Sequence, residues 1–256
     1  MNIVSQKDYL LLKKQIKEAP TFVFSILDCK IGGTVYTSCA SLESIFIKSN
    51  AGLYYVTGST GNAAFMERIA AVFDEAAAKN ERFTLFSYSE EWNRIVENAL
   101  GNRIRKIERY AFTFEQAAYR NRKTNTARPY QAEKITRTHI EQSKEFDESY
   151  YNEYWGSIDN FLQHGIGFVL KEKNQIISEG VSIFASIDYA EIDIITDANY
   201  RGKGLAFFVA EQFIDHCLSH NIQPRWECNT DNIASVQLAH KLGFTEPRTY
   251  TVYAKK

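Results

Sequence analysis

The spacing of apolar residues along the chain separates helical from extended stretches. In residues 63–79 the apolar side chains Phe65, Ile69, Val72, Phe73 and Ala76 recur every three or four positions, which predicts a long amphipathic helix. Further helices are predicted over 7–18, 91–100, 144–154, 157–164, 205–220 and 233–242. Runs of apolar and β-branched residues predict strands over 21–27, 35–36, 44–48, 53–57, 82–88, 105–114, 133–137, 167–172, 175–186, 189–196, 224–228 and 248–254.

Two stretches of the chain share one order of predicted elements. Residues 53–114 and residues 190–254 each run strand, glycine-containing loop, long helix, strand, short helix, strand. A polar and basic stretch, 119–129, separates the halves and ends at a proline, as linkers often do. We therefore predict an α+β protein with mixed, mostly antiparallel sheets flanked by helices, organised as tandem domains over 1–125 and 130–256.

Composition and charge narrow the classes of function. Hydrophobic residues make up 45% and charged residues 24% of the 256-residue chain, as in ordinary globular proteins. A formal net charge of -1 gives no support for nucleic-acid binding, and no apolar run approaches the roughly 18 residues that a membrane span needs. No signal-peptide core is evident at the N-terminus, so a cytoplasmic location is expected.

The residues that commonly bind metals do not form a metal motif. The four cysteines have no zinc-like spacing and are expected to be free thiols: Cys29, Cys39, Cys217 and Cys228. His216 and His220 stand four residues apart, a spacing that can bind a metal, but no third ligand is evident. We therefore expect no metal site.

The most informative segment is the loop at residues 199–204, between a predicted strand and a long helix. Gly202 and Gly204 allow positive φ and close approach of a ligand to the backbone, and the N-terminus of the following helix offers unpaired N–H groups. Such a turn suits a phosphate or pyrophosphate, and Arg201 and Lys203 add positive charge. The G-x-x-x-x-G-K-[ST] pattern of a Walker nucleotide site is absent from the sequence.

Residues 197–206 resemble the acyl-CoA pyrophosphate loop of the GNAT superfamily of acyltransferases. Residues 232–244, which end in Gly243-Phe244, are similar to the helix that follows in this family. The resemblance covers about 130–256 and implies an acetyl-CoA-dependent N-acetyltransferase that acts on a primary amine of a small molecule. The pairing of GNAT-like halves is similar to a bacterial subgroup that includes acetyltransferases of the aminopolyol antibiotic zwittermicin. The first half has only Gly61 in its loop, so it is expected to be a degenerate domain that binds no CoA.

The resemblance also implies residue roles in donor binding. Backbone N–H groups of 202–205 would hold the pyrophosphate, and the strand before the loop would pair with pantetheine. The full set of expected donor contacts is Ile194, Thr196, Arg201, Gly202, Lys203, Gly204, Leu205, Ala206, Asn232 and Ser235. For Asn232, capping of the following helix is the alternative role.

The acceptor amine is protonated at neutral pH, so a base is needed. Glu191 matches a strand position where some relatives have a glutamate base, and Asp193 shares its face of the strand. Glu227, on the next strand, is a third candidate. Ala239 stands where many relatives have a tyrosine general acid, a loss that a thiol leaving group with a pKa of about 8.5 tolerates.

Other functions remain open at this point. A non-catalytic acyl-CoA-binding sensor would have the same loop and is favoured by Ala239. An aminoacyl or peptidyl transferase built from paired GNAT-like domains would need a tRNA contact, which the net charge does not support. The oligomeric state and the identity of the acceptor are not predicted.

Overall fold

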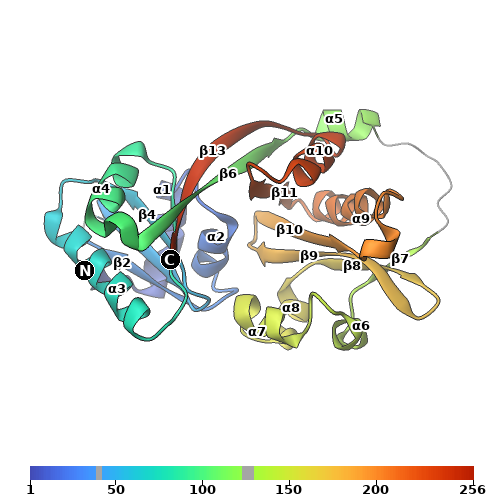
Figure 1. The fold of residues 1–256 in the computed structure, drawn as a ribbon, viewed down its shortest axis with the longest axis horizontal. Helices are drawn as coiled ribbons and strands as arrows, with labels where there is room; N and C mark the ends of the chain where they lie inside the picture. Colours follow the sequence, from blue (N-terminus) through green and yellow to red (C-terminus); the bar gives the residue numbers. More distant parts are fainter. Residues whose placement is uncertain (39–41, 123–129) are drawn as a thin grey trace. The chain divides into compact units, whose positions relative to one another are not determined.

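The computed structural model describes residues 1–38, 42–122 and 130–256, which form two compact units (Figure 1). The first unit consists of Met1–Arg109 and Thr249–Lys256, and the second of Tyr110–Arg248. The last residues of the chain therefore complete the first unit, whereas 110–122 belong to the second. Within the described ranges no helix has the length and apolar character needed to cross a membrane.

The elements follow one another in a mixed α/β order. Up to residue 114 they are β1 (Asn2–Ile3), η1 (Gln6–Asp8), α1 (Tyr9–Gln15), α2 (Thr21–Leu27), β2 (Gly33–Thr37), β3 (Ser44–Ser49), β4 (Leu53–Gly58), α3 (Ala63–Ala78), β5 (Thr84–Ser87), α4 (Glu90–Leu100), η2 (Gly101–Arg103) and β6 (Ile104–Phe114). The later ones are α5 (Gln116–Arg122), β7 (Ala132–Lys134), α6 (Arg137–Gln142), α7 (Glu148–Trp155), α8 (Ile158–His164), β8 (Gly167–Glu172), β9 (Gln175–Ala185), β10 (Tyr189–Thr196), η3 (Ala198–Tyr200), α9 (Leu205–Ser219), β11 (Gln223–Arg225), β12 (Glu227–Asn229), α10 (Ile233–Lys241) and β13 (Phe244–Lys255).

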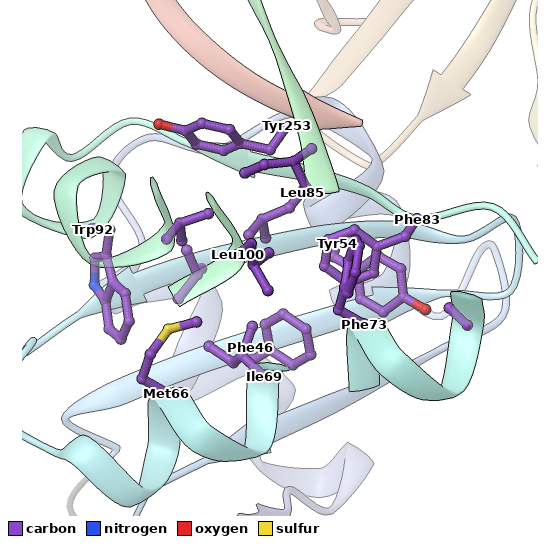
Figure 2. Close-up of a cluster of buried hydrophobic side chains, with 14 of the residues drawn as sticks. Phe46, Tyr54, Met66, Ile69, Phe73, Phe83, Leu85, Trp92, Leu100 and Tyr253 are labelled. Carbon is purple, nitrogen blue, oxygen red and sulfur yellow. The ribbon is translucent and has the colours of Figure 1, made fainter. Parts of the chain in front are cut away.

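In the first unit, antiparallel strands β2, β3 and β4 lead through helix α3 to β5, which lies parallel to β4. The amphipathic face of α3 and the indole of Trp92 on α4 pack on this sheet (Figure 2). Strand β13 pairs antiparallel with β5, from Thr251 opposite Ser87 to Ala254 opposite Thr84. Its Tyr253 is fully buried in the same core and donates a hydrogen bond to Glu97 at 2.7 Å. The C-terminal strand is thus part of this unit's hydrophobic core.

In the second unit, antiparallel strands β7, β8, β9 and β10 lead through helix α9 to β11, which lies parallel to β10. This repeats the connection of β4, α3 and β5. Helix α9 lies on one side of the sheet, and α6, α7 and α8 lie on the other (Figure 1). Gly180 faces α9, because a Cβ at this position would lie 3.3 Å from Val209. On the other side, the indole of Trp155 donates to the carbonyl of Ser182 at 3.1 Å.

The predicted α+β architecture with mostly antiparallel sheets is confirmed. The prediction of a strand over 21–27 is wrong, because these residues form α2 with every side chain buried. A fully buried helix and a buried strand both appear as continuous apolar runs, so periodicity does not separate them. Pro20 stands at the N-cap of α2, where its missing N–H costs nothing.

Two other predicted strands differ in the structure. The strand predicted over 133–137 ends at Lys134, and α6 follows, capped by Thr136 and His139 in a reciprocal capping box. The strand predicted over 224–228 is split into β11 and β12, which belong to different sheets. The predicted linker begins inside α5 (Gln116–Arg122), and its residues 123–129 lie outside the described ranges.

Candidate donor and acceptor site

The glycine turn before α9 has the geometry of an anion-binding loop. Asp197 accepts a hydrogen bond from the N–H of Asn199 at 2.9 Å and starts the short η3 turn. Gly202 and Gly204 then adopt left-handed conformations, with φ of 76° and 77°. Gly204 is the N-cap of α9. A side chain in the left-handed region is strained, so the sequence needs glycine at both positions for the backbone to turn into the helix.

The surroundings of this turn leave room for a ligand. A Cβ added at Gly202 or Gly204 would meet no heavy atom within 4 Å among the residues that the structure describes. Gly204 has no side chain to cap the first N–H groups of α9, which are the groups that bind phosphate at helix N-termini. Arg201 and Lys203 are exposed on either side of Gly202, and Lys203 lies 4.6 Å from the ring centre of Tyr200. These residues fit a pyrophosphate group.

Strand β10 has different partners along its length. It pairs with β9 from Ala190 to Thr196, but its parallel pairing with β11 covers only Tyr189–Glu191. Beyond Arg225 the chain leaves this sheet, and β12 joins the sheet that contains β6. The end of β10, with the predicted contacts Ile194 and Thr196, therefore lies where two neighbouring strands separate. A ligand chain that adds to a strand edge needs such a gap.

The predicted donor contacts on α10 have hydrogen-bond partners within the protein. Asn232 is the N-cap, and its Oδ1 accepts from the N–H of Ser235 at 3.1 Å. The hydroxyl of Ser235 accepts from the indole of Trp226 at 3.0 Å. Leu205 is buried beneath the loop and Ala206 is half-buried in the first turn of α9. At the position of the family's tyrosine, Ala239 is fully buried.

Two of the three carboxylates predicted as bases lie on the sheet face covered by α7. Asp193 is half-buried, and its Oδ2 accepts a hydrogen bond from the hydroxyl of Tyr150 on α7 at 3.0 Å. Glu191 is 8% exposed and is the register partner of Phe184, whose ring packs against α7. Glu227 instead lies on β12, in the other sheet.

A further carboxylate on the α7 face, in addition to Glu191 and Asp193, is not predicted from the sequence. Glu179 on β9 is the register partner of Ile195, is 5% exposed and accepts a hydrogen bond from the hydroxyl of Ser143 at 2.7 Å. Burial, partly offset by the hydrogen bond from Ser143 and assisted by the negative charge of nearby Glu145, raises the pKa of Glu179 to about 7. A signal is present in the sequence, because Glu179 is the only charged residue in the strand predicted over 175–186.

Glu179 opens onto a cleft of about 620 Å³ within the second unit. The cleft is lined by Gln142, Lys144 and Glu145 before α7, by 174–179 at the start of β9, and by 195–199 and Arg201 at the end of β10. The cleft therefore extends from a buried carboxylate to the glycine turn. The glycine turn is evident from the sequence, whereas the cleft is not.

The described part of the chain contains no group of three or more His, Cys, Asp or Glu side chains arranged to hold a metal. The rings of His216 and His220 stack on each other at 4.1 Å between centroids, and the ring of Phe168 packs against His216 at 5.8 Å. Burial and the neighbouring His220 lower the pKa of His216. These histidines therefore form part of an aromatic contact on α9.

Comparison with known proteins places this geometry in context. A family model described as GNAT acetyltransferase matches residues 11–253. An uncharacterised N-acetyltransferase of Bacillus subtilis (strain 168), YdfB, is 36% identical over 253 residues, covering 98% of this chain and 97% of the relative.

Solved structures share the fold over nearly the whole chain. A GCN5-related N-acetyltransferase-like protein from Streptococcus suis aligns over 98% of this chain and 99% of its own, with a TM-score of 0.72 and 21% identity. A tandem GNAT protein from the clavulanic acid biosynthesis pathway aligns over 97% of this chain and 93% of its own, with a TM-score of 0.65 and 11% identity.

Proposed function

Because the chain belongs to the GNAT acetyltransferase family, and so is an N-acetyltransferase, we propose that it moves an acetyl group from acetyl-CoA to a primary amine of a small molecule. The amine would attack the thioester directly. The observation that carries the proposal is the open glycine turn at Gly202 and Gly204, at the start of α9 and beside the separated end of β10.

The donor is proposed to bind mainly through backbone atoms. The N–H groups of 202–205, with Ala206 in the same turn, would hold the pyrophosphate, and Arg201 and Lys203 would add charge at the rim. The backbone of Ile194 and Thr196 would pair with pantetheine where β10 and β11 separate. Asn232 and Ser235 are proposed to border the pantetheine while keeping their hydrogen bonds at the start of α10.

The chain supplies acid–base chemistry from the sheet face under α7. A carboxylate there takes a proton from the bound ammonium, which makes the amine nucleophilic. Glu191 and Asp193 on β10 are the candidates on this face, and Glu227 on β12, in the other sheet, is the third candidate proposed from the sequence. With Ala239 at the usual tyrosine position, the thiolate leaves without a tyrosine acid, as its pKa of about 8.5 allows.

The proposal is tested by calorimetric titration with acetyl-CoA and by thiol release in the presence of amines. We expect one acetyl-CoA site per chain, in the second unit, and thiol release with at least one of a polyamine, an aminoglycoside or an aminopolyol. Tight binding without thiol release from any amine would favour a non-catalytic acyl-CoA sensor. No binding at all would refute the proposed function. The proposed place of action is the cytoplasm, where acetyl-CoA is available.

A further inference from the structure

The cleft in front of Glu179 has the charge of a site for a cation. The buried Glu179 and the exposed Glu145 both line it, and Glu145 lies close enough for its charge to raise the pKa of Glu179. The charged and titratable groups that face Glu179 or share its cleft are Lys144 and Glu145 from the segment before α7, Tyr151 from α7, and Asp197 and Arg201 from the end of β10 and the loop. The cleft lining thus has three carboxylates, Glu145, Glu179 and Asp197, and two cations, Lys144 and Arg201.

A buried hydroxyl beside Glu179 points to a ligand or water position. Tyr151 is fully buried, and its hydroxyl has no hydrogen-bond partner among the residues that the structure describes. Burial, followed by the charges of Glu179 and Asp193, raises the pKa of Tyr151. Leaving such a group unsatisfied costs about 1–3 kcal/mol, so native structures almost always provide it with a partner. A polar group bound between these carboxylates would supply one.

Glu179 combines burial with access to the cleft. Its carboxylate is held by the Ser143 hydroxyl at 2.7 Å, which fixes its position without neutralising it. An acid whose pKa lies near neutrality is half ionised there, and a base with that property is the most effective at taking a proton near pH 7. Neither Asp193 nor Glu191 lines the cleft.

We propose that the cleft is the binding site of a cationic acceptor amine and that Glu179 is the residue that removes its proton. The proposal rests on the proposed function, since it assigns residues to the acceptor side of the same reaction. The class of substrate that follows is a primary ammonium with neighbouring polar groups, because carboxylates outnumber cations in the cleft lining and Gln142, Asn174 and Gln175 add hydrogen-bonding groups.

The proton balance of the step is complete. The ammonium gives one proton to the Glu179 carboxylate, and the neutral nitrogen attacks the thioester carbon. The C–N bond forms and the C–S bond breaks, so the electron pair leaves on the thiolate. The second proton of the nitrogen neutralises the thiolate, and Glu179 returns its proton to solvent through the open cleft.

The test compares Glu179→Gln and Glu191→Gln with the full-length wild type, using acetyl-CoA with spermidine, kanamycin and serinol as amine probes. Gln keeps the hydrogen bond from Ser143 but cannot accept a proton. For Glu179→Gln we expect kcat/KM at neutral pH to fall by about 10²–10⁴-fold, with the Kd for acetyl-CoA unchanged. The exposed Glu141→Gln on α6 is the matched control and should change neither value.

The pH profile separates a proton-accepting role from a structural one. The wild-type rate should rise with pH through an apparent pKa of about 7, and this limb should disappear in Glu179→Gln. Glu145→Gln removes a negative charge that raises the pKa of Glu179, so it should move the limb to lower pH.

The possible outcomes are distinguishable. If the wild type binds acetyl-CoA but acetylates none of the probes, the proposed function fails. If the wild type is active and Glu179→Gln keeps both the wild-type rate and its rise with pH, the assignment of Glu179 is overturned and the proposed function stands. The same conclusion follows if only Glu191→Gln loses the rate and its rise with pH.

Discussion

Replacing Glu179 by Gln is expected to stabilise the protein at high pH, whatever the reaction turns out to be. The carboxyl is 5% exposed, and burial raises its pKa from 4.5 to about 7. The folded state therefore binds this proton more tightly than the unfolded state does. The stability that comes with the protonated group is fully present below the unfolded pKa and is lost as pH rises through the folded pKa.

The magnitude follows from the shift. The folded and unfolded pKa values of Glu179 differ by roughly 2.5, and one pKa unit corresponds to about 1.36 kcal/mol. The free energy of unfolding of the wild type therefore falls by about 3 kcal/mol between pH 4.5 and pH 7. Gln cannot ionise and keeps an oxygen for the Ser143 hydroxyl, so the variant avoids this loss. We expect its free energy of unfolding to match that of the wild type near pH 4.5 and to exceed it by about 3 kcal/mol at pH 8.

The assay is urea unfolding of both proteins at a series of pH values, followed by circular dichroism. The relevant quantity is the difference between variant and wild type at each pH, since other titrating groups cancel in it. Glu141→Gln on α6 is the matched control: its carboxylate is exposed, so its removal should change stability little at any pH. A difference between Glu179→Gln and wild type that does not change from pH 4.5 to pH 8 would show that Glu179 has an ordinary pKa and would refute the reasoning.

Three further predictions concern the donor loop and the two cores. Gly204→Ala should weaken acetyl-CoA binding at least about tenfold by calorimetry, whereas Gly156→Ala, at a similar φ of 78° and equally open, should carry the same backbone strain of about 1 kcal/mol without losing affinity. Equal affinities for acetyl-CoA in the two variants would argue against the loop as the donor-binding site. Tyr150→Phe removes a hydrogen bond to Asp193 and should lower stability by about 1–3 kcal/mol in urea unfolding; an unchanged midpoint would contradict this. Tyr253→Ala should destabilise the first unit by about 3–5 kcal/mol, measured by protease resistance, because the side chain is fully buried.

Long amphipathic and alternating patterns predict their elements correctly, because burial on one face determines both the pattern and the element. The helix at 63–79 corresponds to α3, and the strands at 175–186 and 189–196 correspond to β9 and β10. The pattern failed at 21–27, where all faces are buried and the periodic signal vanishes. It also failed to show that the last strand joins the first unit. That pairing depends on contacts between residues far apart in sequence, such as Val252 with Phe86.

The donor side of the candidate site can be predicted from the sequence, whereas the acceptor side cannot. A pyrophosphate would be held by backbone N–H groups, so the sequence has only to allow the right backbone conformation. Two closely spaced glycines before a helix indicate that conformation. An acceptor base is a side chain whose role depends on what surrounds it. Glu179 is distinguished from any strand glutamate only by the β9–β10 register, the Ser143 hydroxyl and the cover of α7. These contacts come from three separate segments of the chain, so the physical property that makes Glu179 a candidate base exists only in the folded unit.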